Sequence, residues 1–401
     1  MSDPSQHPNV VEELRRLIRE NQWEQRFKDA LASAQKAVVD NKIQTFPQIQ
    51  PGNPQQIIHP DNLETYYKYV DWLVHWIPRD VVIKGISQRS VYNDIVNFYF
   101  ILAQEAVSDL QVPIQPESEP INFEEYPLSK WIVDFANQWG AFLDTPESAA
   151  GVPSFEDAPE YNWDEYMPPP SGYRTFNQFF ARHVKPGMRP IAGLNDPSVI
   201  VSPADCTFAG WWQIGQTNQI IVKGIQWSIE DLLKDCSYAE RFKGGVFTHS
   251  FLNTYDYHRW HTPVEGTVLE TKVVQALCYL DVGMEDDPQS GDPIITAYDG
   301  TGYQFLQTRG IAVIDSPIGL VACIPMGMAQ VSSVVFTADV GVTLHKGEEL
   351  GYFQFGGSDF VMLFERAANV RMLGTPLIDD WPNVHVQQGT WVGNAYPYSF
   401  K

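Results

Sequence analysis

Four side chains in the second half of the sequence have the types and the order needed for catalysis by a serine. Ser358 follows two glycines, His258 and His261 stand three positions apart, and Asp205 lies upstream of both histidines. In a Ser-His-Asp arrangement the carboxylate orients the imidazole, which accepts the proton of the serine hydroxyl. Histidine suits the base because it titrates near neutral pH. No G-x-S-x-G pattern surrounds Ser358, so the nucleophile turn of an α/β-hydrolase is not predicted.

Each of these residues also has a purely structural interpretation. Residues 351–364 contain two runs of aromatic and β-branched residues on either side of Gly-Gly-Ser-Asp. This pattern predicts a β-hairpin with Ser358 at its turn. Asp205 alone is compatible with a turn or a cap, and the two histidines with structural hydrogen bonds. The spacing of His258 and His261 is a weak metal signal, since no cysteine or acidic ligand accompanies them at metal-binding spacing. No metal is therefore predicted.

Composition and charge restrict the classes of function. The chain has 401 residues, of which 44% are hydrophobic, enough for a large buried core. The net charge of −22 argues against nucleic acid and anionic membrane as partners, because both bind clustered Lys and Arg. Four cysteines without a CxxC pair favour buried reduced thiols over a zinc ribbon or a disulfide framework. The first residues contain no apolar run of the kind found in signal peptides, so a cytoplasmic protein is predicted.

The hydrophobic pattern predicts an α+β protein. A helical N-terminal domain over residues 1–145 precedes a mainly antiparallel or mixed β domain over residues 171–401, which would carry the catalytic residues. Residues 146–170 are acidic and rich in proline, which disfavours regular helices and strands and predicts a linker. The helices are expected within residues 9–40, 66–77, 91–107, 128–143, 177–183 and 229–235, with a loop over 46–60. The β-rich runs are residues 200–201, 208–214, 219–222, 245–251, 266–274, 310–315, 319–325 and 328–337.

Four motifs that contain the candidate residues resemble, in order and spacing, those of the phosphatidylserine decarboxylase family. They are Phe-Phe-Ala-Arg-His-Val-Lys-Pro-Gly-Met-Arg-Pro-Ile at 179–191, Ser-Pro-Ala-Asp at 202–205, Asp-Tyr-His-Arg-Trp-His-Thr-Pro-Val-Glu-Gly at 256–266, and Gly-Gly-Ser at 356–358. The run Leu-His-Lys-Gly-Glu-Glu-Leu-Gly at 344–351 also resembles the family's approach to its processing serine. Four motifs in register are a far stronger signal than any one of them.

The resemblance implies a carboxy-lyase that is made as a zymogen and cleaves itself between Gly357 and Ser358. Ser358 matches the processing serine and the precursor of a covalently bound pyruvoyl group, Asp205 the acid and His261 the base, while His258 matches a second histidine of the site. The pyruvoyl ketone would form a Schiff base with a substrate amine and accept the electrons released with carbon dioxide. His258 or His261 would then reprotonate the carbon. The two products, residues 1–357 and 358–401, are expected to stay associated.

Two positions depart from the family pattern. Cys206 stands where glycine usually follows the acid, and Asp359 where threonine or serine usually follows the processing serine; both could alter processing. The long helical N-terminal region without a membrane anchor is similar to the soluble fungal branch that contains the tryptophan decarboxylase of the psilocybin pathway. This implies a soluble amino-acid substrate, with aromatic, tryptophan-like molecules as candidates.

Three functions remain open from the sequence. The first is an amino-acid decarboxylase. The second is the same chemistry on phosphatidylserine, which would call for an apolar or basic membrane-docking face that the composition does not indicate. The third is a non-catalytic binding or scaffold relative, against which the retention of all four candidate residues counts. The oligomeric state is left open too.

Overall fold

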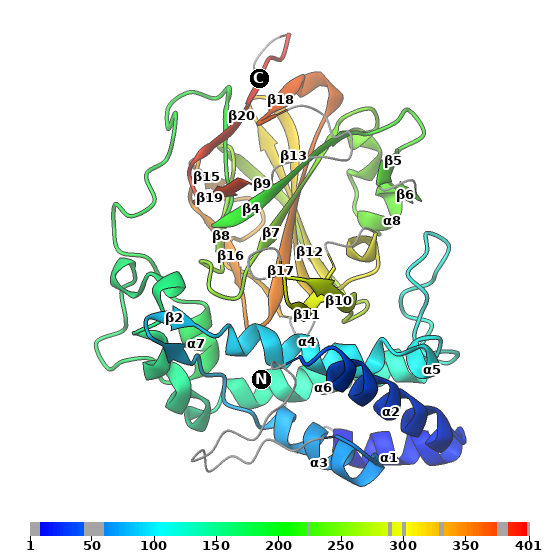
Figure 1. Cartoon of the computed structure of the whole chain (residues 1–401). Helices are drawn as coiled ribbons and strands as arrows, with labels where there is room; N and C mark the ends of the chain where they lie inside the picture. The colour runs from blue at the N-terminus through cyan, green and yellow to red at the C-terminus, as the bar shows by residue number, and fades with distance from the viewer. Residues whose placement is uncertain are drawn as a thin grey trace.

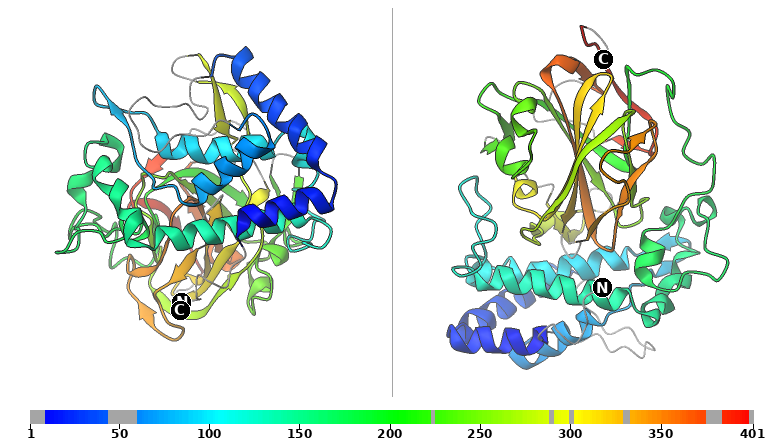
Figure 2. Two further views of the ribbon diagram at one scale, coloured as in Figure 1. Left: turned by 90° about the horizontal axis from the view of Figure 1, so that it is seen from below. Right: turned by 180° about the vertical axis from the view of Figure 1, so that it is seen from behind.

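The structure is a computed structural model that describes residues 9–43, 60–222, 225–287, 291–298, 302–328, 333–374 and 384–398. A layer of α-helices from the N-terminal region lies across one end of a β structure built by the rest of the chain (Figure 1). The views from below and behind show the same two parts (Figure 2). This arrangement confirms the predicted α+β class. The predicted loop over residues 46–60 lies outside the described residues apart from its last position.

The helical layer follows the predicted periodicity. Asn9 begins the first helix by accepting hydrogen bonds from two backbone N–H groups, and Asn62 forms a capping box with Thr65. The apolar faces meet in a shared core in which Phe98 and Phe135 stack with ring centroids 4.7 Å apart. The helices are α1 (Val10–Glu20), α2 (Glu24–Asp40), α3 (Leu63–Val74), α4 (Ser90–Leu102), α5 (Glu105–Ser108) and α6 (Pro127–Leu143), with strands β1 (Val82–Ile83) and β2 (Ile86–Ser87) between α3 and α4.

An antiparallel eight-stranded sheet forms the centre of the β structure as far as it is described, in the order β15-β9-β12-β13-β17-β7-β4-β19. Its central strand β17 is buried on both faces: Phe360 and Met362 face one apolar core, and Val361 and Leu363 face another. Strands with two covered faces read as continuous apolar runs. The strands are β4 (Cys206–Gln213), β7 (Val246–Leu252), β9 (Gly266–Val274), β12 (Arg309–Ser316), β13 (Gly319–Met328), β15 (Thr343–Leu344), β17 (Gly357–Phe364) and β19 (Val384–Val386).

Smaller sheets and short helices surround this sheet. Two of the sheets have three strands, in the orders β14-β16-β8 and β18-β20-β3. Their strands are β14 (Val334–Phe336), β16 (Glu349–Phe353), β8 (Arg259–His261), β18 (Val370–Met372), β20 (Trp391–Ala395) and β3 (Val199–Val201). The other elements are the pairs β5 (Gln219–Val222) with β6 (Ile225–Ser228) and β10 (Val282–Asp286) with β11 (Pro293–Ala297), and the helices α7 (Phe176–Phe180) and α8 (Ile229–Leu232).

The predicted hairpin around Ser358 is wrong. Strand β16 pairs with β14 and β8, whereas β17 pairs with β13 and β7 in the large sheet. Residues 354–356 therefore carry the chain from one sheet to another. Gly356 has a φ of 139°, which residues with a Cβ rarely adopt, so the glycine is needed for this bend. Turn chemistry predicted the bend, but strand partners far away in the sequence determine that it is not a hairpin.

Residues 146–170 are more ordered than a solvated loop. They contain the 3-10 helices η2 (Pro146–Phe155), η3 (Pro159–Tyr161) and η4 (Trp163–Glu165). Phe155 and Tyr161 are buried, and both rings contact Phe179 of α7. The prolines explain the absence of an α-helix from this segment, which lies wholly within the described residues. The division into domains at 1–145 and 171–401 stays a prediction.

Candidate active site

Ser358 lies near the start of β17 and is fully buried. It is paired with Gly327 on β13 and with Leu252 on β7. Its Oγ has no hydrogen-bond partner within the described residues. A buried hydroxyl left without a partner costs about 1–3 kcal/mol, so such groups are rare in native structures and need an explanation. A hydroxyl that reacts with its own backbone provides one.

The loop after β7 carries His258 toward the segment that precedes Ser358. The carbonyl oxygen of His258 accepts a hydrogen bond of 2.9 Å from the backbone N–H of Phe353. The imidazole is fully buried and stacks on Phe180, with ring centroids 3.8 Å apart. Burial, and after it the charge of Arg182, lower the pKa of His258 well below its usual value, although the backbone of Asp256 opposes this shift. The ring is therefore neutral at pH 7, and the burial that keeps it neutral also makes it a weaker base than a free imidazole.

His261 lies on β8 and is held through both ring nitrogens. Nδ1 donates to the carbonyl oxygen of Gly347 at 2.9 Å, so Nε2 is the acceptor and takes a hydrogen bond of 3.1 Å from the hydroxyl of Tyr257. Burial lowers the pKa of His261 and keeps the ring neutral. The backbone N–H of His261 donates to the carbonyl oxygen of Pro203, two residues before Asp205. Tyr257 thus occupies the nitrogen that a general base would use.

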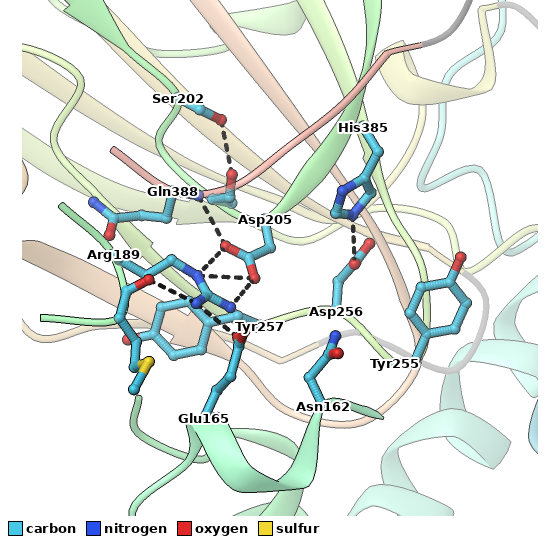
Figure 3. Close-up of polar contacts among 12 residues, drawn as sticks. Asn162, Glu165, Arg189, Ser202, Asp205, Tyr255, Asp256, Tyr257, His385 and Gln388 are labelled. Atoms are coloured by element: carbon cyan, nitrogen blue, oxygen red, sulfur yellow. Dashed lines mark hydrogen bonds and ion pairs between the residues drawn. The ribbon is translucent and has the colours of Figure 1, made fainter. Parts of the chain in front are cut away.

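Asp205 is neutralised by an arginine (Figure 3). Arg189 donates to Asp205 through Nε at 2.8 Å and Nη2 at 2.6 Å, and the backbone N–H of Gln388 donates to Asp205 Oδ1 at 2.8 Å. Nη1 of Arg189 also lies 2.8 Å from a carboxylate oxygen of Glu165. Such two-pronged pairs fix orientation as well as charge. The carboxylate positions the segment beside His261 without bonding to its ring.

The sheet register relates Asp205 to Ser358. Thr207 on β4 pairs with Phe251 on β7, so Cys206 is level with Leu252, the partner of Ser358. Adjacent strands are about 4.8 Å apart, which places the chain at Cys206 roughly 10 Å from Ser358. The four candidate residues therefore gather at one end of the sheet, but none of the hydrogen bonds described joins Ser358, an imidazole and Asp205 into a triad. Their catalytic roles stay predictions.

A second acid and base pair lies beside this group. Nε2 of His385 on β19 is 2.8 Å from Asp256 Oδ1, and Figure 3 shows the pair next to the ion pair of Arg189. The hydrogen bond to Asp256 raises the pKa of His385. Sequence analysis did not assign roles to Arg189, Tyr257 or His385. Arg189 could have been inferred, since a buried carboxylate needs a cation, but His385 is 129 residues from its partner and lies outside the motifs.

A surface cavity of about 410 Å³ opens next to the segment that precedes Ser358. Asn177, Gln354 and Tyr352 line it together with Arg182 and Arg259. Its volume is in the range of small-molecule sites. In the described part of the chain no cluster of His, Cys, Asp and Glu could hold a metal ion, and no helix is long and apolar enough to cross a membrane.

Comparison with known proteins decides the family. A model of the phosphatidylserine decarboxylase family matches residues 176–388, the range that contains all four candidate residues. The chain belongs to the phosphatidylserine decarboxylase family. The family resemblance inferred from the motifs is thereby confirmed.

This chain covers different shares of the length of individual relatives. Phosphatidylserine decarboxylase proenzyme 3 of Schizosaccharomyces pombe is 33% identical over 226 residues, 56% of this chain but only 22% of the relative. The proenzyme of Fusobacterium nucleatum is 30% identical over 264 residues, 65% of this chain and 83% of the relative. Decarboxylase iboD of Amanita muscaria is 30% identical over 264 residues, 57% of this chain and 74% of the relative. The chain thus spans about a fifth of the fission yeast protein.

The two departures from the phosphatidylserine decarboxylase pattern are both buried. Asp359 lies on the face of β17 opposite Ser358, where it accepts a hydrogen bond of 3.2 Å from Tyr303 and lies 3.0 Å from Nε2 of His249. Burial raises the pKa of Cys206 to about 12, so its thiol stays protonated. Neither side chain contacts Ser358 in the interactions described.

Proposed function

We propose that this chain is a decarboxylase proenzyme that cleaves itself between Gly357 and Ser358, forms a pyruvoyl group from Ser358, and removes carbon dioxide from a small soluble amino acid. One observation carries the proposal. The Ser358 hydroxyl is buried and has no partner within the described residues, directly after a glycine pair whose first member has a φ of 139°. Other buried hydroxyls in the described part of the chain, such as those of Tyr66 and Thr145, also lack a partner, so it is the position of Ser358 directly after the glycine pair that singles it out.

Self-cleavage requires bond changes only at Gly357 and Ser358. Ser358 Oγ loses its proton and attacks the Gly357 carbonyl carbon; the peptide C–N bond breaks and its nitrogen takes up a proton, which leaves an ester. Loss of the Ser358 Cα proton then expels the Gly357 carboxylate from Cβ and separates the chains. Addition of one water molecule and loss of ammonia convert the resulting dehydroalanine end into the pyruvoyl group. That group supplies an electron sink for decarboxylation.

The neighbouring residues have distinct parts in this proposal. His258 is neutral and tied to Phe353, so it can take up and return a proton close to the reacting segment. His261 is the second candidate base, with its acceptor nitrogen held by Tyr257 in the precursor. Asp205, paired with Arg189, holds the chain that supports His261. Each role is a proposal that substitution can test.

Three observations favour an amino-acid substrate over phosphatidylserine. The net charge of −22 disfavours docking on an anionic membrane surface. The cavity of about 410 Å³ beside Gln354 has the volume of a small-molecule site, and it lies next to the segment that precedes Ser358 without being lined by Ser358 itself. One relative, from Amanita muscaria, is named as a decarboxylase without mention of phosphatidylserine, whereas the fission yeast and Fusobacterium relatives are named phosphatidylserine decarboxylase proenzymes. Aromatic, tryptophan-like amino acids are the first class to test.

The experiment compares the wild-type chain with Ser358→Ala. We expect wild-type protein to separate on a denaturing gel into residues 1–357 and a small fragment with a blocked N-terminus, and Ser358→Ala to stay intact. Ser250→Ala, which changes another buried serine of the same sheet, should still be cleaved. An intact wild-type chain would refute the proposal and support a non-catalytic relative. Cleavage that persists in Ser358→Ala would mean proteolysis.

The substrate is tested on the cleaved protein. Amine formation is measured with a panel of free amino acids, and carbon dioxide release with vesicles that contain phosphatidylserine. We expect activity on a free amino acid and none on the vesicles. Activity on the vesicles alone would replace the amino-acid proposal by the lipid one.

A further inference from the structure

The side chain of Asn177 connects the helical layer to the segment just before the proposed cleavage point. Asn177 is 3% exposed and lies on α7. Its Oδ1 accepts a hydrogen bond of 3.1 Å from the backbone N–H of Phe355. Its Nδ2 donates to Asp144 Oδ1 at 3.0 Å and to the carbonyl oxygen of Gly140 at 3.1 Å. One amide therefore binds both the C-terminal end of α6 and the segment 354–356.

The ring of Phe355 is held by the same two helices. It packs edge-on against Trp139 of α6 at 5.2 Å and against Phe176 and Phe180 of α7 at 5.2 and 5.4 Å between ring centroids. Phe180 also stacks on His258. Backbone and side chain of Phe355 are thus fixed relative to the candidate proton acceptor.

Three successive backbone N–H groups upstream of the cleavage point have assigned partners. Phe353 donates to the carbonyl of His258 at 2.9 Å, Gln354 to the carbonyl of Ser333 at 3.2 Å, and Phe355 to Asn177 Oδ1. The first two partners are backbone atoms, whereas the third is a side chain that a substitution can remove. Downstream, β17 is held on both edges by β13 and β7. Asn177 therefore supplies a side-chain restraint on the upstream backbone that a single substitution removes.

We propose that Asn177 is a positioning residue for self-cleavage, an inference that rests on the proposed function. Attack by Ser358 Oγ on the Gly357 carbonyl requires the reacting atoms to be held about 3–3.5 Å apart, and a misplacement of 1 Å can cost about 100-fold in rate. Asn177 fixes the chain two residues before Gly357. Because it also binds α6, the helical layer must be docked before the bond is presented for cleavage.

Three variants test the proposal, with the rate of cleavage of newly synthesised chain measured by gel and by mass. Asn177→Ala is expected to slow cleavage at least about tenfold. Gln111→Ala is the matched control, because it removes another buried amide of the helical layer, bonded to the carbonyl of Leu102. It should lower the melting temperature to a similar extent and leave the cleavage rate unchanged.

The third variant exchanges two groups. Asn177→Asp combined with Asp144→Asn keeps an acceptor for Phe355 and a hydrogen bond between positions 177 and 144, but it removes the donor to the carbonyl of Gly140, so it should restore part of the rate. The proposal would be overturned if Asn177→Ala were cleaved at the wild-type rate, or if Gln111→Ala were slowed as much as Asn177→Ala. It would also be overturned if the exchanged pair were cleaved no faster than Asn177→Ala. A wild-type chain that stays uncleaved would instead refute the proposed function, and the role of Asn177 with it.

Discussion

Arg189 neutralises two carboxylates at the edge of the candidate site. Its side chain is 3% exposed, and that of Asp205 is 5% exposed. A buried carboxylate that loses its cation keeps its desolvation penalty without compensation, which typically costs about 3–5 kcal/mol. The pair therefore determines whether the segment before β4 can stay buried next to His261.

We expect Arg189→Leu to lower the free energy of unfolding by about 3–5 kcal/mol, because Asp205 and Glu165 lose their shared cation. Urea unfolding in a Ser358→Ala background measures this on an uncleaved chain. Arg189→Lys should recover only part of the loss, since an ammonium group cannot make the two-pronged contact. Arg15→Leu removes an exposed pair with Glu64 and the contact of Arg15 with the Tyr67 ring, and it should lower the free energy of unfolding far less than Arg189→Leu. If Arg189→Leu and Arg15→Leu lowered the free energy of unfolding equally, Arg189 would not be compensating buried carboxylates.

At the scale of elements, α4 contains a carboxylate in an unfavourable environment. Burial raises the pKa of Asp94 to about 7, from an ordinary value near 3.8. The unfolded chain therefore ionises this group more readily than the folded one. Stability is lost as pH rises from about 4 to about 7, and the full penalty applies above pH 7.

Asp94→Asn should remove this penalty. We expect the variant to raise the melting temperature at pH 8 by more than at pH 5, measured by differential scanning calorimetry in the Ser358→Ala background. Asp29→Asn, on the exposed face of α2, is the control and should change the melting temperature equally at both pH values. If Asp94→Asn raised the melting temperature equally at pH 5 and pH 8, the raised pKa of Asp94 would be contradicted.

Elements were predicted well where the signal is local. The periodicity of apolar residues located α1 to α6, and short apolar runs located most strands of the large sheet, because both patterns depend on neighbours in sequence. The shorter strands β8, β10, β11, β18 and β20 lie outside the predicted runs. The hairpin failed because pairing partners are chosen over long distances. In the same way, motifs led to Ser358, His258, His261 and Asp205, whereas Arg189 and His385 became recognisable only once distant segments were brought together.

For the whole molecule, the distribution of residues 358–401 among the sheets predicts the fate of the cleaved chain. β17 lies between β13 and β7, β19 pairs with β4, and β20 pairs with β3. The residues from Phe360 to Phe364 are at most 1% exposed. Separating the small fragment would expose this strand and break the large sheet at its centre.

We expect the two fragments to co-elute in size-exclusion chromatography under native conditions, because the apolar area that separation would expose is large. In guanidinium chloride they should elute separately, which serves as the control for complete cleavage. Separate elution without denaturant would contradict the central place of β17.

The crossover at residues 354–356 has a consequence for the timing of activity. Cutting after Gly357 would leave every pairing of residues 358–364 intact, so the new chain end would stay anchored in the sheet, while the upstream end would be held by the non-covalent contacts of Phe353, Gln354 and Phe355. Before the cut, Ser358 is sealed from solvent. In the proposed proenzyme the reactive position would thus stay closed to substrate after folding and until the cut, and the reaction that forms the pyruvoyl group would also be the step that opens it.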